Sequence, residues 1–281
     1  MNANIAILLA LGMVLVAADA FATGPAPETK RKVLVYTRNH VTNGKGFVHD
    51  NIAESVAAVK EIGAENGFDS DVSDDPNVFT EQNLKQYAAI VFSNSNNEAF
   101  ETVAQRDAFR RYIRAGGGFV GIHSASGSER EWPWFWSLLG GKFRRHPKLQ
   151  PFEVRVVDAD HPATKDLPTT FTWTDECYYL DNLNNNIKPL LVTDPSTLED
   201  PKLAEYPGTL FGNAMPIAWY HEFEGGRSFY TALGHKKEHY QDPFLVKQIA
   251  GGILWAMEGS GAKVGTSQNN DDSVTATRVT K

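Results

Sequence analysis

Hydrophobic and polar positions in the first half of the chain alternate between short apolar runs and longer amphipathic segments. The apolar runs are rich in β-branched residues and have the composition of buried parallel strands; they lie at 32–37, 88–95 and 119–122. The segments at 49–67 and 101–115 repeat apolar side chains at helical spacing, and each runs into glycine. Strand and helix in alternation predict a flavodoxin-like, doubly wound α/β sheet that is mostly parallel.

The second half of the chain is expected to extend this sheet with antiparallel strands. Five strand-like segments follow one another with few helices between them, at 152–158, 171–180, 189–194, 216–223 and 227–234. An apolar helix at 244–257 then closes the fold. Neither a linker nor an internal repeat separates the halves, so we predict one folded domain over residues 30–259.

The two ends of the chain differ in composition from this domain. Residues 5–18 form an apolar run that small residues follow, with an A-x-A pattern at Ala18–Ala20 and again at Ala20–Ala22. This predicts a signal peptide over residues 1–22 and a secreted or periplasmic location, and the run is short for a stable membrane span. Because residues 1–4 carry no Lys or Arg, an uncleaved anchor is the alternative. Residues 260–281 are small, polar and aperiodic, which predicts a flexible tail.

Composition and charge exclude some classes of function. The 281 residues are 42% apolar and 22% charged, enough to bury a sizeable core, and the formal net charge is −7. The densest basic stretch, residues 142–148, is short and is expected to be a solvated loop. Nucleic acid is therefore not an expected partner. Cys177 is the single cysteine and has no partner for an internal disulfide.

Candidate chemistry centres on His123, which directly follows the strand at 119–122. In open α/β sheets, ligands bind at the carboxyl ends of the strands, and catalytic nucleophiles are located there. Other polar residues near the ends of predicted elements are His49, His146, Asp175, Glu176, His235 and His239. Their imidazoles and carboxylates suit a divalent metal such as Zn²⁺ or Mn²⁺. The expected ligands are His49, His123, His235 and a carboxylate from Glu176 or Asp175, of which we choose Glu176.

Other interpretations of these residues stay open. Without a metal, the same groups could bind sugar hydroxyls and transfer protons, with His123, Asp175 and Glu176 as catalytic residues. Each histidine could also be a hydrogen-bonded structural residue, although several together favour a functional site. We expect structural or exposed positions for His40, His161 and His221. Trp219 and Tyr178 are candidates for stacking on a sugar, with core packing favoured.

A set of motifs in register carries a family resemblance over residues 33–258. They are Gly46-Phe-Val-His49-Asp-Asn-Ile52, Gly116-GGFVGIHSA-Ala125, Gly140-Gly-Lys-Phe143 with His146-Pro147, Asp160-His-Pro162, Thr174-Asp-Glu-Cys-Tyr178, Pro216-Ile-Ala-Trp219 and Gly226-RSFYTALGH-His235. Together they resemble the ThuA-like (trehalose utilisation) family within the class I glutamine amidotransferase-like fold. In related amidotransferases, a cysteine nucleophile occupies the place that His123 takes here. Glutaminase activity is therefore not expected.

The resemblance implies carbohydrate metabolism. With the predicted signal peptide, which suggests an extracytoplasmic step, we expect an enzyme that acts on a glycoside or oxidised sugar by metal- or histidine-assisted hydrolysis, elimination or isomerisation. The alternative is a non-catalytic carbohydrate-binding or scaffold protein. Either function gives the chain a small sugar or glycoside as its partner.

Overall fold

The computed structural model of the chain describes residues 30–42, 46–206 and 211–259. The predicted signal peptide (1–22) and tail (260–281) lie outside the described residues. Within the described part, no helix is long and apolar enough to cross a membrane.

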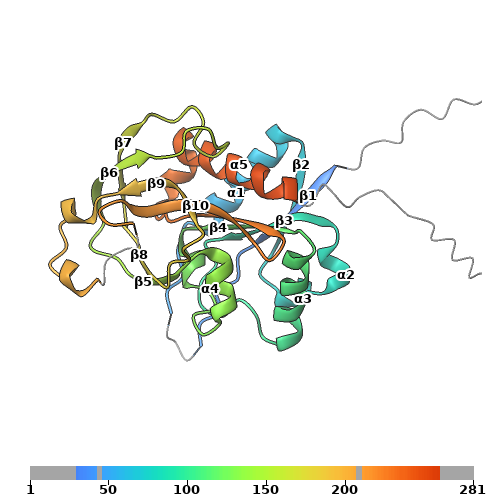
Figure 1. Cartoon of the computed structure of the whole chain (residues 1–281). Coiled ribbons are helices and arrows are strands. Elements are labelled where there is room, and N and C mark those ends of the chain that lie inside the picture. The colour runs from blue at the N-terminus through green and yellow to red at the C-terminus, as the bar shows by residue number, and fades with distance from the viewer. Residues whose placement is uncertain (1–29, 43–45, 207–210, 260–281) are drawn as a thin grey trace, which may run out of the picture.

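A nine-stranded sheet forms the centre of the fold, in the order β2-β1-β3-β4-β11-β10-β9-β6-β7 (Figure 1). Its strands are β1 (Arg31–Tyr36), β2 (Phe68–Ser73), β3 (Tyr87–Ser93), β4 (Gly118–Ile122), β6 (Gln150–Val156), β7 (Thr170–Asp175), β9 (Lys188–Thr193), β10 (Met215–Phe223) and β11 (Gly226–Thr231). The pairs from β2 to β11 are parallel, and those from β11 to β7 are antiparallel. The predicted fold class, including the antiparallel extension, is confirmed.

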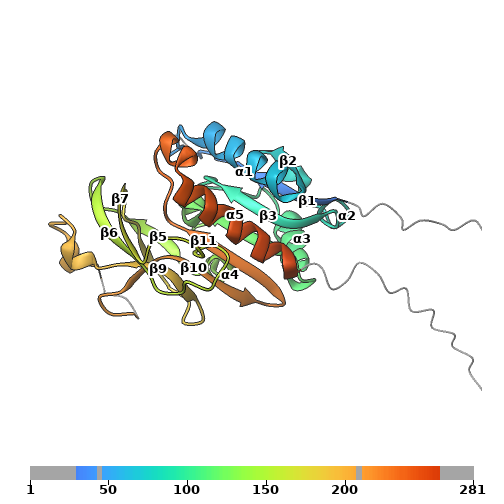
Figure 2. The same ribbon diagram turned by 90° about the horizontal axis from the view of Figure 1, so that it is seen from above.

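Helices cover both faces of the parallel part of the sheet (Figures 1 and 2). The α-helices are α1 (Ile52–Asn66), α2 (Glu81–Leu84), α3 (Val103–Arg114), α4 (Pro133–Leu139) and α5 (Pro243–Met257). Short 3-10 helices are η1 (Pro76–Val78), η2 (His123–Gly127), η3 (Pro195–Thr197), η4 (Leu203–Glu205) and η5 (Lys237–Gln241). Helices α1 and α5 lie on one face and α3 and α4 on the other, which is the arrangement of a doubly wound sheet.

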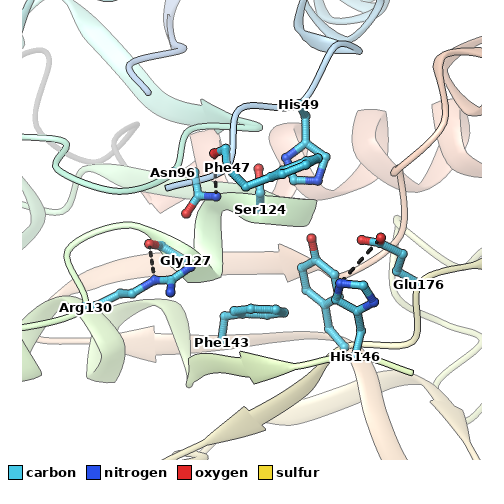
Figure 3. Close-up of a pocket in the computed structure, with 10 residues that line it drawn as sticks. Phe47, His49, Asn96, Ser124, Gly127, Arg130, Phe143, His146 and Glu176 are labelled. Carbon is cyan, nitrogen blue, oxygen red and sulfur yellow. Dashed lines mark hydrogen bonds and ion pairs between the residues drawn. The ribbon is translucent and has the colours of Figure 1, made fainter. Parts of the chain in front are cut away.

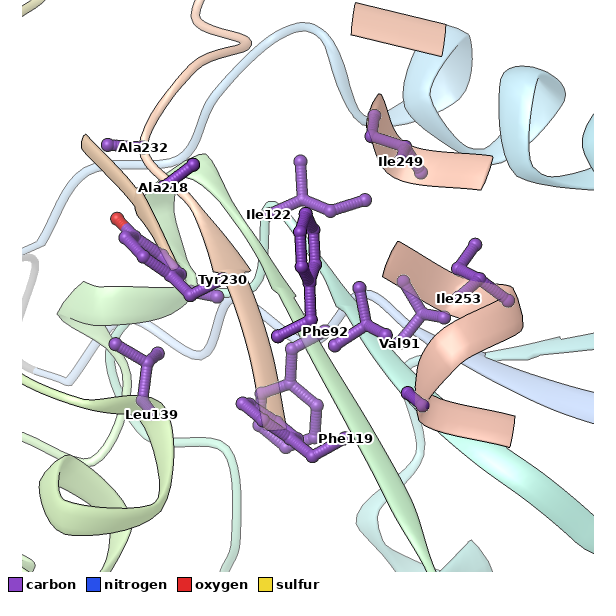
Figure 4. Packing of buried hydrophobic residues seen from close by; sticks show 14 of the residues in the cluster. Val91, Phe92, Phe119, Ile122, Leu139, Ala218, Tyr230, Ala232, Ile249 and Ile253 are labelled. Atoms are coloured by element: carbon purple, nitrogen blue, oxygen red, sulfur yellow. The ribbon is translucent and has the colours of Figure 1, made fainter. Parts of the chain in front are cut away.

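The core has a layer on each side of the sheet, because successive strand residues point to opposite faces. Ile249 and Ile253 of α5 pack on one side (Figure 4). On the other side aromatic rings dominate: Phe119 of β4 and Phe135 of α4 meet edge to face, with their centroids 5.8 Å apart. Gly252 lets α5 approach closely, because a Cβ there would lie 2.4 Å from the ring of Phe229. These two layers fix the strands whose carboxyl ends carry the candidate residues.

The structure corrects two details of the sequence prediction. The segment 171–180, expected to be one strand, ends as β7 at Asp175 and resumes as β8 (Tyr179–Asp181). The break occurs where the Asp175 carboxylate accepts a hydrogen bond from the Glu176 backbone N–H, which turns the chain out of the sheet. The stretch expected to be a solvated loop contains β5 (Lys142–Arg145), which pairs antiparallel with β8 in a separate two-stranded sheet.

Candidate metal centre

Four side chains converge from four separate loops at the carboxyl edge of the sheet. His49 lies between β1 and α1, His123 follows β4, Glu176 follows β7 and His235 follows β11. Each offers one nitrogen or oxygen atom, and these four atoms all lie within 4.8 Å of one another. These are the four residues that the sequence predicts as metal ligands, and the cluster they form could hold a metal ion.

The spacing of the donor atoms resembles that of a metal's ligand shell. The Nε2 atoms of His49 and His123 are 3.2 Å apart, and Nδ1 of His235 lies 3.2 Å from Oε2 of Glu176. The same Oε2 lies 3.8 Å from Nε2 of His123. Ligands at about 2.0–2.1 Å from a tetrahedral ion lie about 3.3 Å from one another, so modest adjustments suffice to bring these atoms onto one ion.

Backbone conformation and a hydrogen bond fix the orientation of His123. Its φ of +47° lies in the left-handed region, which turns the chain sharply from β4 into η2. Its Nδ1 lies 2.7 Å from the Ala232 carbonyl oxygen, which can only accept, so Nδ1 carries the proton. The lone pair of Nε2 is then directed into the cluster, as in metal-bound histidines that donate to an outer acceptor.

Burial favours neutral imidazoles at two of the three histidines. Burial, assisted by the charge of His235, lowers the pKa of His49 to about 4. Burial and then the neighbouring His49 hold the pKa of His123 well below its ordinary value. By contrast, the hydrogen bond to Glu176 raises the pKa of His235. Burial opposes ionisation of Glu176, but His235 and His146 together lower the pKa of its carboxyl overall.

Asp175 is fully buried and anchors two of the loops that carry the cluster. Its Oδ2 accepts hydrogen bonds from Trp173 Nε1 at 2.9 Å and from the Gly234 backbone N–H at 2.8 Å. Its Oδ1 accepts one from the Glu176 N–H at 2.8 Å. Burial nevertheless raises the pKa of this carboxyl. The Asp175 carboxylate thus connects the backbones of Glu176 and of Gly234, the residue before His235.

Asn51 holds the His235 loop from the opposite side. Its Nδ2 donates to the carbonyl oxygens of Gly234 and His235, at 2.7 Å in each case. Asn51 lies only two residues after His49, so this amide ties the first candidate ligand loop to the last. Together with Asp175, it makes three of the four loops one hydrogen-bonded unit.

A cavity of about 300 Å³ opens beside the cluster (Figure 3). Its lining residues are Phe47, His49, Asn96, Ser124, Gly127, Arg130, Phe143, His146, Glu176 and Tyr178. The hydroxyl of Tyr178 lies 2.8 Å from Nε2 of His123, and burial raises the pKa of Tyr178 well above its ordinary value. The side chain is therefore a neutral hydroxyl that donates to that lone pair. The cavity combines polar groups with aromatic walls, as small-molecule sites do.

The remaining sequence predictions have mixed outcomes. His123 follows strand β4 as predicted and is completely buried, next to the cavity residue Tyr178. Asp175 does not line the cavity, whereas Tyr178 does. Trp219 is 0% exposed and donates to the Leu139 carbonyl oxygen, so it is a core residue.

The histidines expected outside the site lie outside the cluster. His40 is exposed, and His221 is buried with Nε2 2.7 Å from the Leu138 carbonyl oxygen. His161 accepts a hydrogen bond from the Ala163 N–H at 3.1 Å. Burial lowers the pKa of His161 to about 4, which the carboxylates of Asp158 and Glu258 partly oppose.

Sequence reasoning did not identify several cavity residues. Phe47 is 58% exposed and lies beside His49, and Phe143 lies across the cavity floor (Figure 3). Arg130 and Ser124 also line the cavity. Phe47 and Phe143 lie within the motifs quoted above, which was the signal available, but nothing in the pattern distinguishes them from core aromatics.

The fold and the cluster define an α/β protein with a candidate metal centre at the carboxyl edge of its sheet. Residues 32–256 match the ThuA family, described as trehalose utilisation, so the chain belongs to this family. Membership supports a carbohydrate-related role. A search of curated proteins gave no match.

Solved structures agree with this family. A protein of Bacteroides uniformis described as thua-like is 26% identical, with a TM-score of 0.63 over 84% of this chain and 95% of that one. Another, from Parabacteroides merdae, is 19% identical, with a TM-score of 0.62 over 83% of this chain and 91% of that one. At its lower identity, the second protein shows the shared fold alone.

Proposed function

We propose that this protein is an enzyme that acts on a carbohydrate, a glycoside or an oxidised sugar, with the help of a divalent metal ion. The observation that carries the proposal is the convergence of His49, His123, Glu176 and His235 beside a cavity of about 300 Å³. Membership of the ThuA family supports the carbohydrate, and the donor set supports the metal.

The candidate ligands suit a metal ion in two respects: their donor atoms are close together, and the donor nitrogen of His123 carries a lone pair rather than a proton. Two imidazole nitrogens face each other at 3.2 Å. In the neutral ring of His123 the proton lies on Nδ1, which donates to Ala232, so Nε2 keeps its lone pair. Three imidazoles and a carboxylate are typical ligands of Zn²⁺ and also suit Mn²⁺.

The chemistry expected of the site follows from its groups. A bound ion would act as a Lewis acid towards a sugar oxygen and would increase the acidity of a water molecule. With the ion on Nε2 of His123, the neutral hydroxyl of Tyr178 would be free to donate a hydrogen bond to a substrate oxygen. His146, half-buried at the cavity wall, can exchange protons with the same substrate. Phe47 and Phe143 present apolar faces for the C–H surface of a sugar ring. These groups serve hydrolysis, elimination or isomerisation alike.

We assign Asp175, predicted as catalytic, a positioning role. Both of its oxygens already accept hydrogen bonds from protein N–H groups, and its side chain does not reach the cavity. The sequence at residues 5–22 further supports the proposal that the reaction takes place outside the cytoplasm.

A turnover screen tests the proposed function. Purified protein is assayed against a panel of glycosides and keto sugars, after treatment with chelator and again after addition of Zn²⁺ or Mn²⁺. We expect turnover that the chelator abolishes and the ion restores, and that His235→Ala removes. His40→Ala, at an exposed histidine outside the cluster, is the matched control and keeps activity. Binding of sugars without any turnover would instead support a non-catalytic binding protein.

A further inference from the structure

Arg130 differs from most arginines of the described chain because no described carboxylate pairs with it. Other arginines form ion pairs, among them Arg106 with the buried Glu129 and Arg145 with Asp200. Arg130 is solvent-exposed and lines the cavity, where it forms no ion pair with a described carboxylate, Glu176 of the opposite wall included. In a protein of net charge −7, such an arginine in a cavity is available to an anionic ligand.

Local contacts fix the position of the Arg130 guanidinium. Its Nε donates to the Gly127 carbonyl oxygen at 3.1 Å, and its Cζ lies 5.5 Å from the centroid of the Phe143 ring. Two contacts therefore hold the planar group, while the N–H groups on its Nη atoms have no acceptor among the described residues.

Ser124 supplies a second group that lacks a partner in the same cavity. Its side chain is 2% exposed, and its Oγ forms no hydrogen bond within the described structure. A buried hydroxyl without a partner is unfavourable, so a ligand oxygen that accepts its hydrogen bond would gain affinity. Ser124 follows His123 directly, which puts this hydroxyl between the metal cluster and the arginine side of the cavity.

The two ends of the cavity suit different parts of one ligand. In Figure 3, Arg130 lies on one side of Phe143, and His146 and Glu176 lie on the other. The volume of about 300 Å³ is at the lower end of ligand sites, which span about 300–1,000 Å³, and favours a single sugar ring. A sugar ring in the cavity beside Phe143 would face the candidate metal at one end and the guanidinium at the other.

We propose that the cavity binds a carbohydrate with a negatively charged group, a carboxylate or a phosphate, and that Arg130 binds this group. The inference rests on the proposed function for the carbohydrate nature of the ligand. Arg130 then determines specificity, because it binds the charged sugar more tightly than the neutral analogue. The Ser124 hydroxyl donates a hydrogen bond to a ligand oxygen.

Calorimetric titration tests this inference on the full chain, without metal and with Zn²⁺. The ligands are D-glucuronate, D-glucose 6-phosphate and D-glucose, which differ in the charged group. We expect one or both anionic sugars to bind more tightly than glucose to the unmodified protein. Arg130→Gln should weaken their binding by at least about tenfold and that of glucose by much less, since a charge-assisted pair is lost. Arg155→Gln, which removes an arginine outside the cavity, is the matched control and should change neither.

The arms of the experiment separate the possible results. A preference for glucuronate assigns the charged group as a carboxylate, and a preference for glucose 6-phosphate assigns it as a phosphate; both support the inference. Equal binding of all three sugars, equal effects of Arg130→Gln on all three, or no binding of any would overturn it. Loss of turnover or of metal binding bears on the proposed function alone, since an Arg130-dependent preference in metal-free protein still supports the inference.

Discussion

Replacing Asp175 by asparagine tests whether this buried carboxylate positions the side chains of the candidate metal centre. The two side chains have nearly the same shape, but one oxygen becomes an amide NH₂. If the NH₂ replaces Oδ2, it faces the two donors Trp173 Nε1 and Gly234 N–H; if it replaces Oδ1, it faces only the Glu176 N–H. The second orientation loses fewer hydrogen bonds, and it releases the backbone of the candidate ligand Glu176.

The magnitude follows from that one lost bond. A buried N–H left without an acceptor is unfavourable by about 1–3 kcal/mol, and removal of a buried charge offsets part of this. We therefore expect the free energy of unfolding of the metal-free protein to fall by about 1–3 kcal/mol. Groups that orient metal ligands typically change metal affinity by about 10–100-fold, so the Kd for Zn²⁺ should rise by about that factor.

Urea unfolding and calorimetric Zn²⁺ titration measure the two quantities separately. Asp194→Asn is the matched control, because Asp194 caps the short helix η3 through the Ser196 N–H and asparagine caps equally well. A folded Asp175→Asn protein with unchanged Zn²⁺ affinity would refute the positioning role. If the free energy of unfolding falls and the Zn²⁺ affinity does not change, Asp175 has a structural role only.

Two further predictions concern single histidine contacts. The pKa of His161 is lowered from 6.5 to about 4 in the folded protein. Between pH 6.5 and pH 4 the unfolded chain therefore binds more protons than the folded protein. The free energy of unfolding should fall as the pH falls through this range. His161→Asn keeps an acceptor for the Ala163 N–H but does not titrate, so urea unfolding should show a shallower pH dependence, and an unchanged slope would contradict this origin. Tyr178→Phe removes the hydroxyl that donates to Nε2 of His123, which should destabilise metal-free protein by about 1 kcal/mol. Because that hydroxyl competes with a metal for the same lone pair, Zn²⁺ affinity should not fall, and a tenfold loss on titration would show that the competition is absent.

Much of the fold could be predicted because local patterns and connection rules agree. The apolar run before His123 has the composition of a buried strand, and the glycine-rich segments on either side predict where this strand begins and ends. Strand and helix in alternation then place the ends of parallel strands at one edge. This is why residues as distant in sequence as His49 and His235 could be expected to meet.

Other features depend on contacts that no local pattern reports. Segment 171–180 reads as one strand by composition, yet the hydrogen bonds of Asp175 with Trp173, Gly234 and Glu176 end β7 there. The exposed charge of Arg130 resembles that of any surface arginine until the Phe143 ring and the cavity are seen beside it. Tertiary packing, rather than periodicity, decides such positions.

Metal stoichiometry tests the central claim of this account most directly. Protein freed of metal is incubated with Zn²⁺ or with Mn²⁺, dialysed and subjected to elemental analysis, together with His235→Ala, Glu176→Gln and the control His40→Ala. The account predicts one tightly bound ion per chain in the unmodified protein and in His40→Ala, and at least about tenfold weaker binding in the two cluster variants. Unmodified protein that retains neither ion, or cluster variants that retain it equally well, would contradict a metal centre at His49, His123, Glu176 and His235.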